Sequence, residues 1–224
     1  FNPPRYLPLL EVVSAPDVDS EILNRFCSFA DLQLGKRVTM CNDSPGFIGN
    51  RLGIYFIQRA YKATIDHELS IEDTDAMLGR PIGLPKTAVF GLMDLVGIDL
   101  IPHVTESLLS YLPASDPFHK IAGTGKKTII SMIDEGYTGR KGKGGFYRLN
   151  REEGKKVKEA RNLITGKYSP VNRRAGFPSA KMGKSGLSAI LDCDDKGAKL
   201  VLDVLLDSLS YAAHMVPEVS DDIY

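Results

Sequence analysis

The pattern of apolar and polar positions divides the start of the chain into three short segments. Residues 6–13 (YLPLLEVV) and 36–41 (KRVTMC) contain β-forming side chains, and each run predicts a strand. Between them, apolar side chains recur at helical spacing, after a capping stretch at residues 17–20 and before Gly35. These apolar positions are Ile22, Leu23, Phe26, Phe29 and Leu32. Because two strands alone make a poor sheet, residues 1–43 are predicted to close a larger α/β domain.

From residue 44 onward the apolar positions follow helical spacing. Asp43 or Ser44 with Pro45 predicts a helix start, since a capping side chain precedes Pro in the first turn. This helix is expected to extend over residues 47–65, which carry a wide apolar stripe. The pattern predicts a helical domain over residues 44–149. Its further helices are expected at residues 70–78, 88–96, 99–112 and 127–135, with a Gly/Pro connector at residues 79–85.

The last third of the chain has a different composition. Residues 150–197 begin with a stretch rich in Lys, Arg, Gly and Ser, which predicts a linker with one charged helix at residues 152–161. Residues 198–215 have helical periodicity, and the acidic ending that follows them echoes residues 68–73. Residues 198–224 are therefore expected to start a second helical domain.

Composition and charge exclude several classes of protein. Hydrophobic residues make up 43% and charged residues 25% of the chain, which is ordinary for a soluble globular protein. Lys and Arg together number 28, as do Asp and Glu, so the formal net charge of zero gives no bulk attraction to nucleic acid or to an anionic membrane. No apolar run is long enough to cross a bilayer, and no signal peptide is expected. Because the chain starts with Phe, we expect a piece of a longer protein.

The cysteines bear on the compartment and on metal binding. Cys27, Cys41 and Cys193 are widely spaced and form no C-x-x-C pair. This pattern favours reduced thiols over a disulfide framework or a metal site. We therefore expect no metal and a reducing, cytoplasmic location.

Two polar side chains stand in otherwise apolar segments. Asn50 follows the predicted helix start within the first turns, where an amide side chain can point back to the helix entrance. Glu11 lies inside an apolar strand, where burial of a carboxylate is unfavourable unless a partner compensates its charge. Simpler alternatives remain open. Residues 43–51 also fit a well-capped amphipathic helix, and Glu11 also fits the solvent face of an edge strand.

Taken together, Phe1-Asn2-Pro3, Glu11 and residues 43–51 (DSPGFIGNR) resemble the 3-hydroxyacyl-CoA dehydrogenase family. In that family an F-N-P segment follows the catalytic His, a Glu partners this His, and D-x-P-G-F-x-x-N-R opens the helical domain. The resemblance extends to about Tyr147 and implies a mainly α fold. The implied fold consists of the family's helical C-terminal domain, preceded by a short β-α-β remnant of a Rossmann-type domain. Residues 79–99 resemble structural segments of the helical domain, which forms much of the dimer interface in the family.

The resemblance also implies roles for four residues. Glu11 would orient the catalytic imidazole and stabilise its positive charge, and Asn50 would contact the substrate near the reacting carbon. Asn2 and Lys141 would flank NAD, although a flexible basic loop is an alternative for Lys141. The expected His is absent, because the histidines present are His67, His103, His119 and His214. No Gly-rich stretch of the chain completes a G-x-G-x-x-G or P-loop pattern.

As a whole, the resemblance implies a fragment of an L-3-hydroxyacyl-CoA dehydrogenase of fatty-acid β-oxidation. The parent would oxidise (S)-3-hydroxyacyl-CoA to 3-oxoacyl-CoA with NAD, would act on acyl-CoA as a homodimer, and would resemble multidomain bacterial enzymes. The fragment alone is expected to be inactive, and neither nucleic acid nor a membrane is an expected partner. Two alternatives remain. The helical domain could serve as a dimerisation or scaffold module without catalysis, or the parent could be a dehydrogenase of another 3-hydroxy acid.

Overall fold

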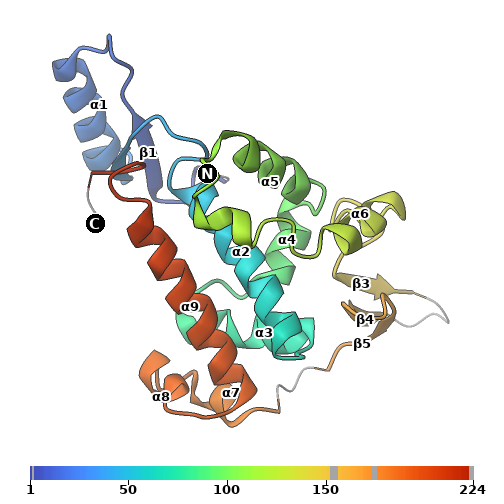
Figure 1. The fold of residues 1–224 in the computed structure, drawn as a ribbon. Helices are drawn as coiled ribbons and strands as arrows, with labels where there is room; N and C mark the ends of the chain where they lie inside the picture. Colours follow the sequence, from blue (N-terminus) through green and yellow to red (C-terminus); the bar gives the residue numbers. More distant parts are fainter. Residues whose placement is uncertain (2, 152–155, 173–175, 222–224) are drawn as a thin grey trace. The chain divides into compact units, whose positions relative to one another are not determined.

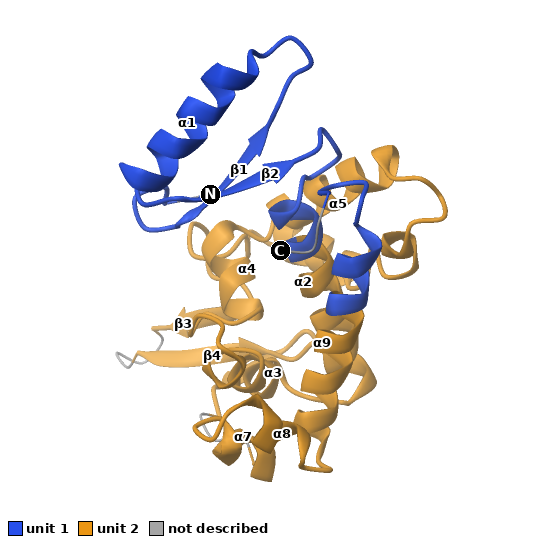
Figure 2. Cartoon of the chain, turned by 90° about the vertical axis from the view of Figure 1, so that its left-hand side faces the viewer, with its two compact units in different colours: residues 1–53, 209–224 blue, residues 54–208 orange. Residues whose placement is uncertain are grey.

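The computed structural model describes residues 1, 3–151, 156–172 and 176–221. The chain forms two compact units, which are coloured separately in Figure 2. Residues 1–53 and 209–224 form the first, here called the α/β unit, and residues 54–208 form the second, the helical unit. Most elements are helices, and a short β-α-β part lies at the start of the chain (Figure 1). The structure thus confirms the predicted mainly α fold with its β-α-β beginning.

The α/β unit is built on two parallel strands. Strands β1 (Leu9–Val13) and β2 (Arg37–Cys41) pair in parallel over five residues, and helix α1 (Ser20–Leu32) connects them. The carboxylate of Asp19 caps α1 by accepting the backbone N–H groups of Glu21 and Ile22, at 2.7 and 3.3 Å. The capping residue, the helical spacing and the two β-forming runs therefore correctly predict this strand–helix–strand unit.

Helix α2 (Gly49–Asp66) begins later than predicted. The chain makes a turn before it, because Gly46 and Phe47 adopt left-handed φ angles of 78° and 50° that interrupt a helical path. The buried hydroxyl of Ser44 has no hydrogen-bond partner among the described residues, so it does not cap the helix. The prediction of a helix start at residues 43–47 is wrong for this reason. The helix instead starts at Gly49, whose N–H is bound by a side chain from β1.

The helical unit takes its core from packed aromatic rings. Tyr61, Phe90 and Phe146 are almost fully buried, with ring centroids 4.9–6.2 Å apart. The helix predicted at residues 70–78 is α3 (Ile71–Met77), and the Ser70 hydroxyl caps it by accepting the N–H of Asp73. The further elements between α2 and residue 146 are η1 (Arg80–Ile82), α4 (Phe90–Val96), α5 (Leu100–Tyr111), η2 (Pro117–Lys120) and α6 (Lys126–Asp134).

A second sheet replaces the predicted charged helix. Strands β3 (Tyr147–Asn150), β4 (Val157–Arg161) and β5 (Tyr168–Pro170) pair antiparallel in the order β3-β4-β5. The helix prediction for residues 152–161 is therefore wrong over 157–161, and residues 152–155 lie outside the described part. The charged side chains are not a solvated helix face. Arg148 of β3 forms an ion pair of 2.7 Å with Glu159 of β4 and lies 4.1 Å from the centre of the Tyr168 ring.

The predicted linker also carries helices α7 (Pro178–Met182) and α8 (Leu187–Leu191). Helix α9 (Lys196–His214) follows and confirms the helix predicted at residues 198–215. Residues 209–221 cluster with the α/β unit. Whether residues 198–224 start a second helical domain stays a prediction. In the part of the chain that the structure describes, no helix combines the length and apolar character that a membrane span requires.

Candidate functional site

Glu11 binds the start of helix α2. Its carboxylate Oε1 accepts the backbone N–H of Gly49 at 2.6 Å, although the two residues are 38 positions apart. The N-terminal N–H groups of a helix lack partners within the helix and carry partial positive charge, so they stabilise a carboxylate at this place. The side chain is half-buried, and within the described residues Oε2 makes no hydrogen bond. Glu11 therefore has a defined partner and a second oxygen that can accept a further donor.

Asn50 follows Gly49 directly and lies exposed in the first turn of α2. Its side-chain amide has no hydrogen-bond partner among the described residues, so both its N–H donor and its oxygen acceptor are available. The structure thus brings the two predicted catalytic residues to one helix entrance. A carboxylate that can orient a base thus binds the residue directly before an amide that can bind a carbonyl or hydroxyl oxygen.

Arg51, the next residue, is fully buried with 0% of its surface exposed. Its guanidinium group donates to the hydroxyl of Tyr211 at 2.9 Å through Nε. It also donates to both carboxylate oxygens of Glu218, at 2.8 and 3.2 Å. Tyr211 and Glu218 are functional-site neighbours that the sequence reasoning missed. The available signal was that Arg51 lies at helical spacing from the apolar positions Ile54 and Tyr55, because a guanidinium group buried with such a face requires an anionic partner.

The C-terminal residues also bind the end of strand β2. The backbone N–H of Asn42 donates to the carbonyl oxygen of Val219 at 2.9 Å. The side-chain amide of Asn42 donates to the carbonyl oxygens of Pro217 and Glu218, at 3.0 and 3.3 Å. We call residues 211–220 the tail. Within the α/β unit, the tail is bound to residues on both sides of the turn that leads into α2.

The two predicted cofactor residues are placed differently. Asn2 lies outside the described residues. Lys141 lies in the helical unit, and its ammonium group is 2.8 Å from the carboxylate of Asp99. This hydrogen-bonded cation holds the pKa of Asp99 below its ordinary value. Lys141 remains about half exposed at 54%, so it can reach a bound molecule only by sharing or leaving its pairing with Asp99.

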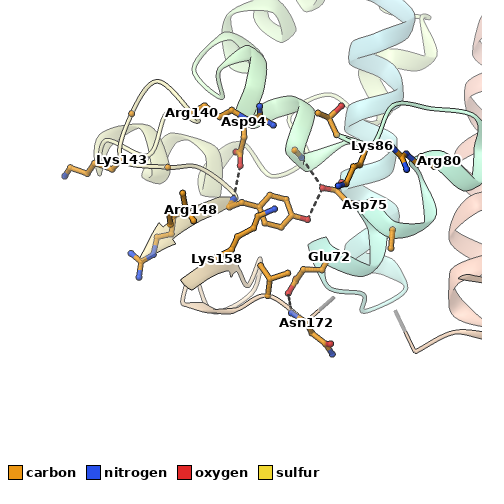
Figure 3. A pocket seen from close by; sticks show the side chains of 18 of the residues that line it. Glu72, Asp75, Arg80, Lys86, Asp94, Arg140, Lys143, Arg148, Lys158 and Asn172 are labelled. Carbon is orange, nitrogen blue, oxygen red and sulfur yellow. Dashed lines mark hydrogen bonds between the residues drawn. The ribbon is translucent and has the colours of Figure 1, made fainter. Parts of the chain in front are cut away.

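The helical unit contains an open cleft of about 1240 Å³ (Figure 3). Figure 3 shows Arg140 beside Asp94 at one side of the cleft, and Arg80 and Lys86 near Asp75 at the other. Seven basic and three acidic side chains line it, so its lining favours anionic groups of a bound molecule. The basic residues are Arg80, Lys86, Arg140, Lys143, Arg148, Arg151 and Lys158.

Asp75 lies in the wall of this cleft and caps helix α4 from outside it. Its carboxylate accepts the N–H groups of Val89, Phe90 and Gly91 at 2.8–3.0 Å, and the hydroxyl of Tyr147 donates to it at 2.9 Å. Burial nevertheless raises the pKa of Asp75 to about 6, since these hydrogen bonds offset only part of the desolvation of the charge.

Asp94 joins helix α4 to the Gly-rich loop before β3. Its carboxylate accepts the N–H groups of Phe146 and Tyr147, both at 2.8 Å, and its backbone oxygen accepts the N–H of Arg140 at 2.8 Å. Burial raises the pKa of Asp94 to about 6. Burial also raises the pKa of Tyr147, together with the nearby charge of Asp75. A Cβ on Gly145 would collide with the Asp94 carboxylate, so this close approach requires Gly.

Residues 91–99 and the Gly-rich loop that carries Lys141 lie more than 35 residues apart in the sequence. The structure joins them through Asp94 and through the Asp99–Lys141 pair. An acidic residue inside an apolar run was again the signal, since such a carboxylate requires hydrogen-bond donors from elsewhere in the chain. Within the described residues, no group of three or more His, Cys, Asp or Glu side chains is placed to hold a metal ion.

Comparison with known proteins agrees with this fold and motif set. Residues 46–149 match the family described as 3-hydroxyacyl-CoA dehydrogenase, C-terminal domain. This match defines the class of the helical domain. Residues 46–149 thus belong to the 3-hydroxyacyl-CoA dehydrogenase family, which confirms the resemblance inferred from the motifs.

The chain spans less than a third of two curated relatives that match it over its whole length. It is 37% identical over 224 residues to a Rickettsia felis protein named "Putative fatty acid oxidation complex trifunctional enzyme", and spans 30% of that protein. It is 30% identical to a Bacillus subtilis protein named "Probable 3-hydroxyacyl-CoA dehydrogenase", all of this chain matching 28% of that protein. The crystal structure of M. tuberculosis FadB2 matches 67% of this chain and 50% of its own, with a TM-score of 0.53 and 26% identity.

Proposed function

We propose that the chain is part of an NAD-dependent L-3-hydroxyacyl-CoA dehydrogenase of fatty-acid β-oxidation. The enzyme would oxidise (S)-3-hydroxyacyl-CoA to 3-oxoacyl-CoA, and the names of the relatives support this reaction class. The observation that carries the proposal is the hydrogen bond from Gly49 to Glu11 beside the exposed amide of Asn50. This arrangement supplies both polar groups that the family motif requires at one helix entrance.

Each of these residues has a defined part in the proposed mechanism. Glu11 Oε1 is held by the Gly49 N–H, and Oε2 accepts the N–H of an imidazole base from a His outside this chain. The carboxylate thereby orients the base and stabilises the positive charge that the imidazole gains when it takes the proton of the 3-hydroxyl group. The Asn50 amide binds an oxygen of the substrate near C3 and fixes the position of the reacting carbon.

A bound NAD would supply the hydride acceptor that oxidation at C3 requires. Within the described residues, Lys141 is the one predicted cofactor contact, and its ammonium group is paired with Asp99. The chain contains no G-x-G-x-x-G stretch, the usual cradle of a dinucleotide pyrophosphate. The donor set for NAD is thus incomplete in these residues, and we assign no step to the cofactor within this chain. We propose that the chain alone is inactive.

The surface of helix α1 supports a larger α/β domain in the active protein. Its apolar side chains are exposed, although they recur at helical spacing like a packed face. They are Ile22 at 64%, Phe26 at 47%, Phe29 at 52% and Leu32 at 77% exposure. We propose that further strands and helices of the NAD-binding domain cover this face. A cytoplasmic location and a homodimer formed through the helical domain complete the proposal.

The test is NADH-dependent reduction of acetoacetyl-CoA by the longer protein, assayed beside the 224-residue chain. We expect activity in the longer protein, none in the chain, a loss of at least about 100-fold on Glu11→Gln and a strong reduction on Asn50→Ala. Glu106→Gln, which changes an exposed carboxylate in the helical unit, should leave activity unchanged. A folded but inactive longer protein would exclude the proposal and favour a dimerisation or scaffold module.

A further inference from the structure

Asn50 lies between two residues that are each held by a distant side chain. On one side, the Gly49 N–H donates to Glu11 at 2.6 Å. On the other, Arg51 donates to Tyr211 and to both oxygens of Glu218. The exposed amide of Asn50 is therefore carried by a backbone segment fixed at both of its neighbours. One of the two fixed points depends on the tail, which lies more than a hundred and fifty residues away in the sequence.

The contact between Arg51 and the tail has the geometry of a strong interaction. The two parallel N–H···O bonds to Glu218 form the fork-to-fork arrangement that fixes both the distance and the orientation of a guanidinium group. The third bond, to the Tyr211 hydroxyl, fixes the plane of the group from another direction. Because Arg51 is fully buried, loss of the Glu218 carboxylate would leave a buried guanidinium charge less well compensated.

The backbone turn before Asn50 is strained, and the contacts of the tail help to hold it. Gly46 and Phe47 both adopt left-handed φ angles, and this region is unfavourable for a bulky residue such as Phe. A strained turn persists only where surrounding contacts hold it. The tail supplies such contacts on both sides, through Asn42 before the turn and Arg51 after it. Without the tail, the turn is free to relax and the helix entrance to shift.

We propose that Glu218 and Tyr211 are positioning residues for Asn50, acting through Arg51. The tail is then an integral part of the site, even though it contributes no group to the reacting atoms. The role of Asn50 in this inference rests on the proposed function, whereas the mechanical coupling between the tail and the helix entrance does not. Two experiments separate these parts.

The first experiment measures backbone amide hydrogen exchange in the 224-residue chain. On Glu218→Gln, exchange at Gly49 and Arg51 should become at least 10-fold faster, while the amides of Thr74 and Leu78 in the helical unit should not change. Asp194→Asn, which removes an exposed partner of Lys199, is the matched control and should change neither set. Unchanged exchange at Gly49 and Arg51 in Glu218→Gln would overturn the coupling.

The second experiment uses the longer enzyme. Glu218→Gln and Tyr211→Phe should lower kcat at least about 10-fold and about 3-fold, with KM changed less than 2-fold, and Glu218→Asp should restore part of the loss. The deciding variant combines Glu218→Gln with Asn50→Ala, and its kcat should be no lower than that of Asn50→Ala alone. If the double variant instead has a kcat lowered by the product of the two single losses, Glu218 does not act by positioning Asn50. If the unaltered enzyme is inactive, the proposed function fails, and the exchange experiment alone decides for or against the coupling.

Discussion

The two buried carboxylates of the cleft should make the helical unit more stable at pH 5 than at pH 7.5. Burial raises the pKa of Asp75 and of Asp94 from 3.8 to about 6 in the folded state. Because the folded-state pKa lies above the unfolded value, the folded state binds these protons more tightly. The resulting stabilisation is fully present below the unfolded pKa and is lost as the pH rises through 6. Each carboxylate therefore destabilises the fold once it is ionised.

The size of the effect follows from the pKa values. A shift of about two units corresponds to about 3 kcal/mol per group when the full titration is covered. Between pH 7.5 and pH 5 only part of this titration takes place, so the free energy of unfolding changes by about 1.4 kcal/mol per group. The charges of Asp75 and Asp94 interact, so the two contributions are not independent. We expect a total gain in the free energy of unfolding of about 2–3 kcal/mol from both groups.

The assay is urea denaturation of the chain at several pH values, followed by far-UV circular dichroism because the chain contains no Trp. Asp75→Asn keeps a polar side chain of the same size but removes one titrating group, so the pH-dependent gain should fall by about half. Asp192→Asn, at an exposed carboxylate, should keep the whole gain. The difference in pH dependence between the unaltered chain and Asp75→Asn gives the contribution of the Asp75 carboxylate, because the histidines titrate equally in both. An unchanged pH dependence in Asp75→Asn would refute the reasoning.

Three further predictions concern single contacts. Gly145→Ala should lower the free energy of unfolding by about 2–4 kcal/mol, because the added Cβ collides with the Asp94 carboxylate. Gly53→Ala on helix α2 is the control: its Cβ meets nothing within 4 Å, so the change should be neutral or stabilising by up to about 1 kcal/mol. Equal effects of the two substitutions in urea denaturation would contradict this prediction. Glu218→Ala should destabilise the chain by about 2–4 kcal/mol, because it removes a carboxylate partner of a buried guanidinium group. Asp66→Ala, which breaks an exposed ion pair, should destabilise it by less than about 0.5 kcal/mol. A smaller loss of stability for Glu218→Ala would mean that water replaces the carboxylate. Lys141→Ala should raise the pKa of Asp99 toward its ordinary value in a carboxyl NMR titration, and an unchanged pKa would exclude the ion pair in solution.

Local signals in the sequence predict the elements that depend on neighbouring residues. Asp19 and Ser70 cap α1 and α3 as expected, because a capping bond spans only two or three residues. The β-forming runs around α1 correctly give a parallel pair. The helix start at residues 43–47 was wrong although the local signal was strong, since Gly46 and Phe47 enter a left-handed turn and the helix takes its first partner from Glu11.

The motif around Asn50 located the candidate site, but the sequence could not supply its surroundings. Alternation and spacing describe which face of an element is apolar, whereas the partner of a buried charge depends on which distant segments meet it. Three such long-range partners appear only in the tertiary structure. Glu218 binds Arg51, and the backbone N–H groups of residues 146 and 147 bind Asp94. Strand β4 likewise pairs with β3.

The sequence by itself therefore determined the family, the β-α-β beginning and the helical character of the middle of the chain, and it indicated Glu11 and Asn50 as candidate site residues. Only the tertiary structure decided that the charged segment after residue 150 forms a sheet, that two buried carboxylates organise the cleft, and that the tail holds the helix entrance. The physical reason is desolvation. Local propensity does not specify the partner of a buried charge, and that partner is set by the long-range contacts that compensate the charge once water is removed.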